Sequence, residues 1–237
     1  MITQLRSTQT VPSTPSDHPG IEPSAVPTAG DIAATKPDFV DISHHQGTVD
    51  WDAYAKDGYK LGACKLSEGE DFTDDKAADN RAAMSRLGLK CGVYHFARPK
   101  AKNMVAEANR EADFYLKQLG TLGKNEFPIL DFEVTNGLQP VQLTRWANTW
   151  CKKVQAATGK TPWLYTGKAI QHQLDPAKLG KYPLWLADYS QWDRDHPPAA
   201  APWPTLAAWQ YTDKFPFDGI GKSDGSYLYG EQPAEAR

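Results

Sequence analysis

The chain has 237 residues, of which 40% are hydrophobic and 11% aromatic, so it can bury the core of one large α/β domain or two small ones. Its formal net charge of −3 offers no basic surface to a phosphate backbone, which argues against nucleic-acid binding. No run approaches the roughly 18 apolar residues of a membrane span, so we expect no membrane insertion.

Residues 1–37 differ in composition from the rest of the chain. They are rich in Pro, Ser and Thr and show neither helical nor strand periodicity, which is typical of a disordered leader or linker. They also lack the apolar core of a secretory signal. We therefore expect a disordered segment over residues 1–37, followed by one folded domain over residues 38–237.

After residue 37, short β-type segments alternate with helical patterns. The expected strands cover residues 38–43, 61–67, 91–97, 128–134 and 162–167. The expected amphipathic helices cover residues 51–57, 75–87, 104–119 and 141–157. Each helix is followed by a glycine, a common way to end a helix before a turn: Gly58, Gly88, Gly120 and Gly159. This repetition predicts a parallel sheet or a barrel.

The last third of the chain departs from the repeat. Strands are expected at residues 182–189 and 206–212, but residues 190–205 between them contain four prolines and cannot form a packed helix. A short strand around residues 226–229 brings the number of strands to eight. We therefore predict an α/β fold, a TIM-like β/α barrel with eight strands and about five helices, with an open doubly wound sheet as the alternative.

The fourth expected strand lies in the stretch FPILDFEV, residues 127–134, which carries two acids in an apolar run. Asp131 and Glu133 are two residues apart, so in a strand both side chains point to the same face. Burying one carboxylate is costly, and burying two side by side costs more. A functional role for this pair is therefore favoured over a structural one.

Further acids lie at or near the carboxyl ends of other strands, where barrel enzymes carry their catalytic groups. Asp41 and Ser43 end the first expected strand, and Asp188 and Asp224 lie near later ones. Taken alone, Asp41 is also explained as a turn cap. For Asp188 we expect a structural role or a role at the rim of the site.

Aromatic side chains accompany these acids at the strand ends. They are Tyr94, Phe96, Tyr165, Trp185, Tyr189, Trp209 and Tyr211. Taken singly, each is better explained by core packing, because a barrel needs large side chains to fill it. Taken together, carboxylates surrounded by flat apolar rings are the composition of a sugar site, where a raised carboxyl pKa supplies a general acid.

Neither a cofactor nor a metal ion is expected. His44, His45 and His95 lie near acids, but no paired helical spacing and no Cys/His motif supports a metal site. The three cysteines also lack metal-ligand spacing, and each lies in an apolar segment. We expect them to be buried free thiols rather than a disulfide: Cys64, Cys91 and Cys151.

The order of these motifs resembles glycoside hydrolase family 25, the Chalaropsis-type lysozymes of bacteria, fungi and phages. The resemblance runs from about residue 38 to residue 230 and rests on seven segments, DISHHQG (41–47), GVYHFA (92–97), ILDFE (129–133), PWLYTG (162–167), LWLADY (184–189), WQYT (209–212) and GIGKSD (219–224). It implies a flattened barrel of eight strands and five helices. It also implies cleavage of the β-1,4 bond between N-acetylmuramic acid and N-acetylglucosamine in peptidoglycan.

The resemblance implies roles for individual residues. It places the paired acids of the family on Asp131 and Glu133, the first-strand aspartate on Asp41, and the late aspartate on Asp224, with Asp218 as a competing candidate. Glu133 is then the general acid and should be protonated in the resting enzyme, while Asp131 stays ionised. The substrate-binding residues are expected to be Tyr94, Phe96, Tyr165, Trp185, Asp188, Tyr189, Trp209 and Gln210.

The spacing of Asp131 and Glu133 does not decide the stereochemical outcome. The separation of carboxyl groups two residues apart in a strand falls between the separations found in retaining and inverting enzymes. The resemblance suggests net retention. The acetamido oxygen of the substrate would be the nucleophile, and Asp131 would orient or stabilise it.

Two other classes of function remain open, another amidosugar hydrolase such as a chitinase or glucosaminidase, and a non-catalytic glycan-binding barrel. A chitinase usually has a longer acidic series on its fourth strand, and a binding module would be expected to have lost one paired acid. The stretch ILDFEV shows neither feature. We expect a monomer that acts on the glycan strands of peptidoglycan, and, without a signal peptide, a phage lysin released from the host cytoplasm or a virion component.

Overall fold

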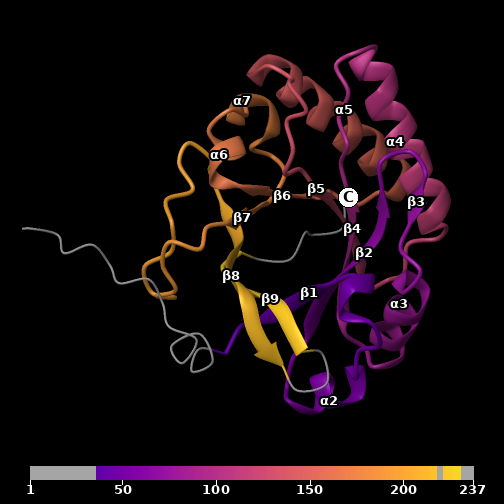
Figure 1. Ribbon diagram of the computed structural model, residues 1–237, viewed down its shortest axis with the longest axis vertical. Coiled ribbons are helices and arrows are strands. Elements are labelled where there is room, and N and C mark those ends of the chain that lie inside the picture. The colour runs from indigo at the N-terminus through magenta and orange to yellow at the C-terminus, as the bar shows by residue number, and fades with distance from the viewer. Residues whose placement is uncertain (1–35, 218–220, 231–237) are drawn as a thin grey trace, which may run out of the picture.

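Strands and helices alternate along the chain and build a barrel, as Figure 1 shows for the computed structural model, which describes residues 36–217 and 221–230. The strands are β1 (Phe39–Ile42), β2 (Leu61–Glu68), β3 (Phe72–Thr73), β4 (Lys90–Phe96), β5 (Glu126–Asp131), β6 (Trp163–Gly167), β7 (Leu184–Ala187), β8 (Leu206–Phe217) and β9 (Gly221–Leu228). The helices are the 3₁₀ turn η1 (His44–Gln46), α2 (Trp51–Lys56), α3 (Ala77–Arg86), α4 (Met104–Leu119), α5 (Pro140–Thr158), α6 (Lys168–Gln171) and α7 (Pro176–Leu179).

The barrel closes through β1. Strands β1, β2, β4, β5, β6, β7 and β8 pair in parallel in that order, and β9 pairs antiparallel with both β8 and β1. The predicted eight-stranded barrel is therefore confirmed, and the open sheet is excluded. The short strand β3, which was not predicted, pairs only with β2 among the described strands and lies outside the closed ring.

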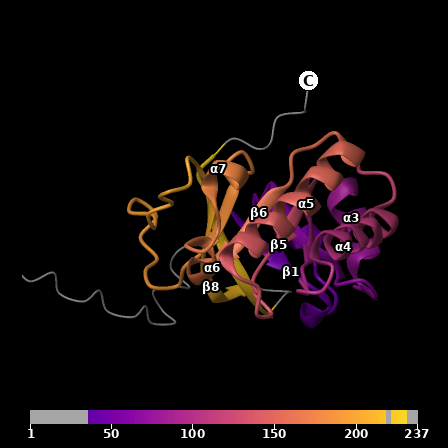
Figure 2. The same ribbon diagram turned by 90° about the horizontal axis from the view of Figure 1, so that it is seen from above.

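The helices cover one part of the barrel. Helices α3, α4 and α5 group together on one side, away from β8, in both ribbon views (Figures 1 and 2). The described residues contain six α-helices rather than about five, because α6 and α7 are additional short helices of four residues each. Residues 188–205, between β7 and β8, form no helix, as their prolines predicted.

Residues on the strands alternate between two cores. One set, which includes Val40, Val93 and Leu130, packs outward against the helices. The other set fills the inside of the barrel and includes Phe39 and Ile129. Because side chains alternate along a strand, residues two positions after an inward-facing residue also face inward. This rule determines which polar side chains reach the interior at the strand ends.

Several predicted boundaries need correction. The fourth expected strand ends at Asp131 rather than at residue 134, and the last strand is longer than residues 226–229. The predicted disordered leader lies outside the described residues except for Lys36 and Pro37, and so does Asp218. The three cysteines are free and buried, as expected. No helix in the described part of the chain is long and apolar enough to cross a membrane.

Candidate active site

A pocket begins where the apolar filling of the barrel ends. Asp41 follows the inward-facing Phe39 by two positions, and Asp131 follows Ile129 in the same way, so both acids face the interior at the carboxyl ends of β1 and β5. The pocket is lined by Asp41, Ile42, Ser43, His45, Gln46, Lys65, Tyr94, Phe96, Ile129, Asp131, Glu133, Tyr165, Trp185 and Asp224. All four predicted catalytic acids therefore meet in one pocket.

Asp131 and Glu133 occupy different environments. Asp131 ends β5 and is 6% exposed, whereas Glu133 lies beyond the strand and is exposed. Just past the strand, the Phe132 carbonyl accepts a hydrogen bond from the Thr166 hydroxyl at 2.7 Å, while the Phe132 N–H still donates to the Tyr165 carbonyl at 2.9 Å. The prediction that both acids lie within one buried strand is therefore wrong for Glu133. The two carboxyl groups are still close enough to hydrogen-bond to each other.

The two acids titrate as a pair. Burial raises the pKa of Asp131 well above its usual range, and the nearby charge of Glu133 raises it further. Desolvation by the pocket walls also raises the pKa of Glu133, although Asp131 and the positive charge of Lys65 oppose that shift. Burial raises the pKa of both acids, so the pair can hold a proton. The assignment of that proton to Glu133 beside an ionised Asp131 stays a prediction.

Asp41 and Asp224 form a second pair of acids. They lie directly opposite each other in the antiparallel pairing of β1 with β9. Burial raises the pKa of Asp41 well above its usual range, and the charge of Asp224 adds to that effect. Desolvation raises the pKa of Asp224 to about 6, with further contributions from the charges of Asp213 and Glu133. The pocket thus holds two coupled acid pairs.

Gln210 fixes the orientation of Asp41. Its Nε2 donates to Asp41 Oδ2 at 3.0 Å, while its Oε1 accepts from the Tyr165 hydroxyl at 2.8 Å and from the Tyr189 hydroxyl. The two hydroxyl donors determine which side of the amide is the oxygen. Gln210 is 1% exposed and is not among the described residues that line the pocket. It was predicted to bind substrate, but its contacts are those of a residue that positions Asp41.

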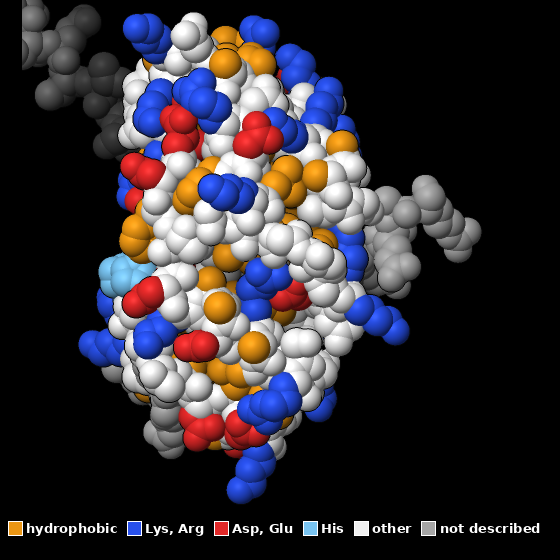
Figure 3. Space-filling model, turned by 90° about the vertical axis from the view of Figure 1, so that its right-hand side faces the viewer, with side chains coloured by type: hydrophobic (Ala, Val, Ile, Leu, Met, Phe, Trp, Pro, Cys, Tyr) orange, Lys and Arg blue, Asp and Glu red, His pale blue; other side chains and the backbone are white. Residues whose placement is uncertain are grey.

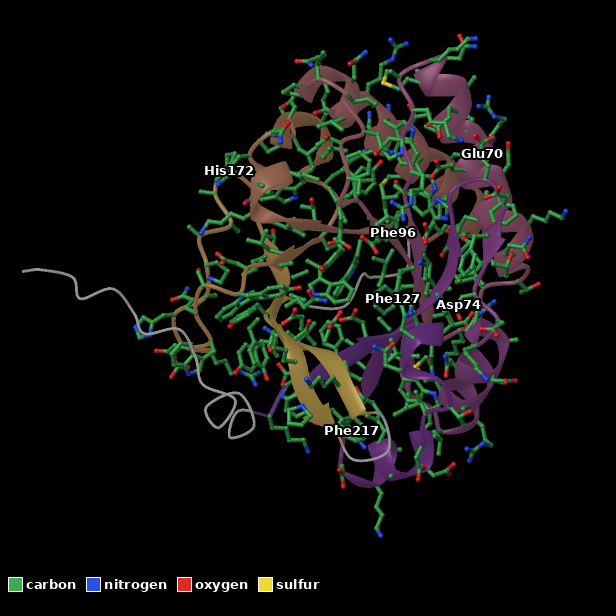
Figure 4. The ribbon with its side chains drawn as sticks, in the orientation of Figure 1. Glu70, Asp74, Phe96, Phe127, His172 and Phe217 are labelled. Atoms are coloured by element: carbon green, nitrogen blue, oxygen red, sulfur yellow. The ribbon has the colours of Figure 1, made fainter. Side chains whose placement is uncertain are left out.

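The predicted aromatic residues divide into two groups. Tyr94, Phe96, Tyr165 and Trp185 line the pocket. Figure 4 shows Phe96 toward the middle of the molecule, with Glu70 out at the side.

The remaining predicted contacts lie elsewhere. Trp209 lies on the opposite face of β8 from Gln210, is fully buried, and donates its indole N–H to the Asp188 carbonyl at 2.7 Å. Asp188 itself accepts from Lys168 and Ser190, and Tyr189 is 44% exposed. Within the described part of the chain, Trp209, Asp188, Tyr189 and Tyr211 do not line the pocket.

Lys65 is a pocket residue that the sequence analysis missed. It lies on β2 two positions after the inward-facing Ala63 and is only 7% exposed. Its ammonium group pairs with Glu68, which in turn accepts from Arg98 Nε at 2.7 Å. A lysine inside the apolar segment LGACKLS was the available signal, because lysine is rarely buried without a partner.

The histidines do not form a metal site. His44 bonds to Asp74 through Nδ1 at 2.8 Å, His45 lines the pocket, and His95 is buried between Ser67 and Glu111. Within residues 36–217 and 221–230, no group of three or more His, Cys, Asp or Glu side chains is arranged to hold a metal ion.

Comparison with known proteins places this chain in a family. The sequence model of glycosyl hydrolases family 25 matches residues 40–220. The chain belongs to this family. The uncharacterized protein YegX of Escherichia coli K12 is 30% identical over 187 residues, which are 76% of this chain and 65% of that protein. Lysozyme M1 of Streptomyces globisporus is 28% identical over 185 residues, which are 73% of this chain and 60% of that protein.

A solved structure supports the same assignment. The bacterial lysozyme from Streptomyces coelicolor superposes with a TM-score of 0.70 at 25% identity, and the match covers 83% of this chain and 94% of that one. By contrast, this family 25 chain spans just under two thirds of the length of YegX and less of lysozyme M1.

The acid pairs of this family 25 barrel should lower its stability as the pH rises. The pKa of Asp224 in the folded protein, about 6, exceeds its ordinary value of 3.8. The contribution of Asp224 to stability is therefore greatest below pH 3.8 and is lost as the pH rises through about 6. Asp224→Asn should therefore raise the melting temperature at about pH 7 by a few degrees, on the order of 1–2 kcal/mol. Thermal melts at about pH 3.5 and pH 7 measure the difference, which should nearly vanish at the lower pH.

The matched control is Asp75→Asn, which removes an exposed carboxylate that does not line the pocket. It should not reproduce the pH-dependent gain. A melting temperature of Asp224→Asn equal to that of the wild type at both pH values would contradict the raised pKa of Asp224 in the folded protein.

Proposed function

We propose that this protein is a lysozyme that hydrolyses the β-1,4 bond between N-acetylmuramic acid and N-acetylglucosamine in bacterial peptidoglycan. The observation that carries the proposal is the convergence of two coupled acid pairs in one pocket with aromatic walls. Glycoside hydrolysis requires a protonated acid at the leaving oxygen and negative charge beside the sugar cation that develops. Membership of family 25 and the likeness to two named lysozymes point to the same chemistry.

Glu133 is the general acid in this proposal. It is the exposed member of its pair and therefore the one that a glycosidic oxygen can reach. Asp131 lies behind it within hydrogen-bonding reach, so the pair can hold one proton and Glu133 can deliver it to the leaving oxygen. A sugar that covers Glu133 removes water from it and shifts the shared proton toward it, because desolvation favours the neutral acid.

The accompanying proposal is net retention of configuration, which the same arrangement supports. Two carboxyl groups that hydrogen-bond to each other are closer than the about 5–5.5 Å of enzymes that use a carboxylate nucleophile opposite the acid. Asp131 therefore fits a role beside the general acid, where it orients the acetamido group of the substrate as nucleophile. Asp224 on β9, whose pKa of about 6 leaves it ionised at neutral pH, supplies negative charge to the developing cation, and Asp41 lies opposite it on β1.

The catalytic unit in this proposal is the barrel domain over residues 38–237, acting as a monomer on glycan strands at the bacterial cell wall. Release from a host cytoplasm as a phage lysin, or carriage on a virion, is the accompanying proposal for how it reaches the wall. Residues 1–37 serve as a linker or leader.

Product analysis tests the proposal against the other amidosugar hydrolases. Purified peptidoglycan is digested, reduced with borohydride, separated and identified by mass spectrometry. A muramidase leaves muramic acid at each new reducing end, so the expected product is N-acetylmuramitol.

Each alternative has a different outcome in that experiment. N-acetylglucosaminitol would assign the protein as a glucosaminidase, and release of no wall fragments at all would assign it as a binding barrel. Either result would overturn the proposal. Asp131→Asn, which removes one pocket carboxylate, serves as the matched inactive control and should release neither product.

A further inference from the structure

Two glutamates of α4 lie in the core, outside the pocket. Glu107 and Glu111 are one helical turn apart, and both are 0% exposed. Figure 1 shows α4 between α3 and α5 at the side of the barrel. The proposed hydrolysis uses neither residue, and two carboxylates buried side by side require a structural explanation.

Each glutamate binds the segment that connects β4 to α4. Glu107 accepts from the Lys100 backbone N–H at 3.2 Å and from the Trp146 indole N–H. Glu111 accepts from the Arg98 backbone N–H at 3.0 Å and from His95 Nε2 at 3.0 Å.

No positive charge touches this pair within the described residues. Burial lowers the pKa of His95 to about 3, so its ring is neutral. With Nε2 protonated toward Glu111, the other ring nitrogen accepts from the Ser67 hydroxyl at 2.8 Å.

The charged residues around the pair are engaged elsewhere. On the loop and on α4, Lys100 and Arg110 both pair with Glu70. From α5, Trp146 and Trp150 face the pair and its histidine with apolar rings. The other charges nearby form their own ion pairs, Lys65 with Glu68, Arg98 with Glu68, and Lys153 with Asp113. The surface on this side accordingly shows basic and acidic side chains intermixed (Figure 3).

A proton shared between the two carboxyl groups completes the arrangement. Oε1 of Glu107 and Oε1 of Glu111 are buried without a hydrogen-bond donor among the described residues, yet the two side chains lie within hydrogen-bonding reach of each other. One proton between them satisfies both oxygens and removes one of the two charges. Consistently, burial raises the pKa of Glu107 to about 8, and hydrogen bonding to Glu111 raises it as well.

Two short chains of contacts connect the pair to the segment that carries Asp131 and Glu133. Trp146, which donates to Glu107, stacks on Phe132 with ring centroids 5.4 Å apart, and Phe132 separates Asp131 from Glu133 in the chain. On the other side, Ala97 precedes the Arg98 amide held by Glu111, and its N–H donates to the Asp131 carbonyl at 2.9 Å.

We propose that Glu107 and Glu111 share one proton and act as positioning residues for Asp131 and Glu133, so that loss of this proton releases the segment that carries the catalytic pair. This inference rests on the proposed hydrolase function for its effect on activity. Loss of the proton places two charges next to each other in a site without a cation, and the carboxylates separate at the expense of their contacts to the loop and to Trp146.

Glu107→Gln tests the proposal because glutamine mimics the protonated acid. Its carbonyl accepts from Trp146 and Lys100, and its amide donates to Glu111. Release of reducing ends from soluble peptidoglycan fragments is measured from about pH 6 to pH 9. The wild type should lose about tenfold in rate over this range, and Glu107→Gln should lose far less.

A thermal melt tests the shared proton without relying on catalysis. The folded-state pKa of Glu107 is raised from 4.5 to about 8, so the wild type loses stability as the pH rises between these values. Glu107→Gln does not titrate there. The melting temperature of the variant minus that of the wild type should therefore increase steadily over this range.

Asp113→Asn is the matched control, because it removes an exposed carboxylate of the same helix. It should keep the alkaline loss of activity of the wild type. If Glu107→Gln loses activity as steeply as the wild type, or if it changes the melts without changing the pH profile, the positioning role is overturned. A melting difference that stays constant with pH overturns the shared proton. A wild type without hydrolysis at any pH refutes the proposed function instead, and the melts still decide on the proton.

Discussion

Glu133→Gln is expected to lower the rate of glycan hydrolysis by about 10²-fold or more, because glutamine keeps the shape of the side chain but has no proton to transfer. The fold should be unaffected, since Glu133 is exposed and lies beyond the end of β5. Loss of one acid also relieves the repulsion that raises the pKa of Asp131, so the melting temperature should not fall. Reducing ends released from purified walls, measured together with a thermal melt, check both expectations.

Glu70→Gln provides the same substitution outside the pocket. Glu70 pairs with Lys100 and Arg110 at the surface and does not line the pocket. This control should hydrolyse walls at nearly the rate of the wild type. Near-normal hydrolysis by Glu133→Gln would remove Glu133 from the role of general acid, and a collapse of both variants would point to a folding defect near α4.

The barrel and its acids were predictable because their signals are local. Alternation of apolar runs with amphipathic helices is set by side-chain periodicity, and parallel strands bring their carboxyl ends to one edge. Asp41 and Asp131 therefore meet although 90 residues separate them. The end of β5 at Asp131 was not predictable, because Phe132 and Val134 continue the apolar pattern of the stretch beyond it.

Other features depend on contacts that a single sequence does not reveal. Trp209 and Gln210 are neighbours on β8, and only the register of that strand decides which one faces the interior. The sequence analysis assigned both residues to substrate binding, whereas Trp209 is a core residue and Gln210 holds Asp41.

Glu107 and Glu111, by contrast, could have been noticed in the sequence, since both lie on the apolar stripe of α4 with Ala108, Ala112 and Tyr115.

Arg81→Met is expected to destabilise the protein by about 3–5 kcal/mol, or a decrease of roughly 10 °C in melting temperature. Arg81 on α3 donates from Nε and Nη2 to the two oxygens of Glu126, each at 2.8 Å, and from Nη1 to the Leu119 carbonyl at 3.0 Å. The side chains of Arg81 and Glu126 are 17% and 9% exposed. Methionine would leave the carboxylate of Glu126 buried without its cation, at the start of the strand that ends in Asp131.

The pH dependence and two further variants separate this cause from a general packing defect. Desolvation alone would raise the pKa of Glu126, but hydrogen bonding from Arg81 holds this pKa below its ordinary value of 4.5. The stabilisation by the ion pair is therefore complete above pH 4.5 and is lost as the pH falls through the pKa that Glu126 has in the folded protein. The deficit of Arg81→Met should therefore shrink in acid. Arg86→Met removes the exposed pair with Asp52 from the same helix and should change the melt little. Adding Glu126→Gln to Arg81→Met should restore part of the loss, because the uncompensated charge is then gone. A double variant less stable than Arg81→Met alone would contradict the buried charge as the cause.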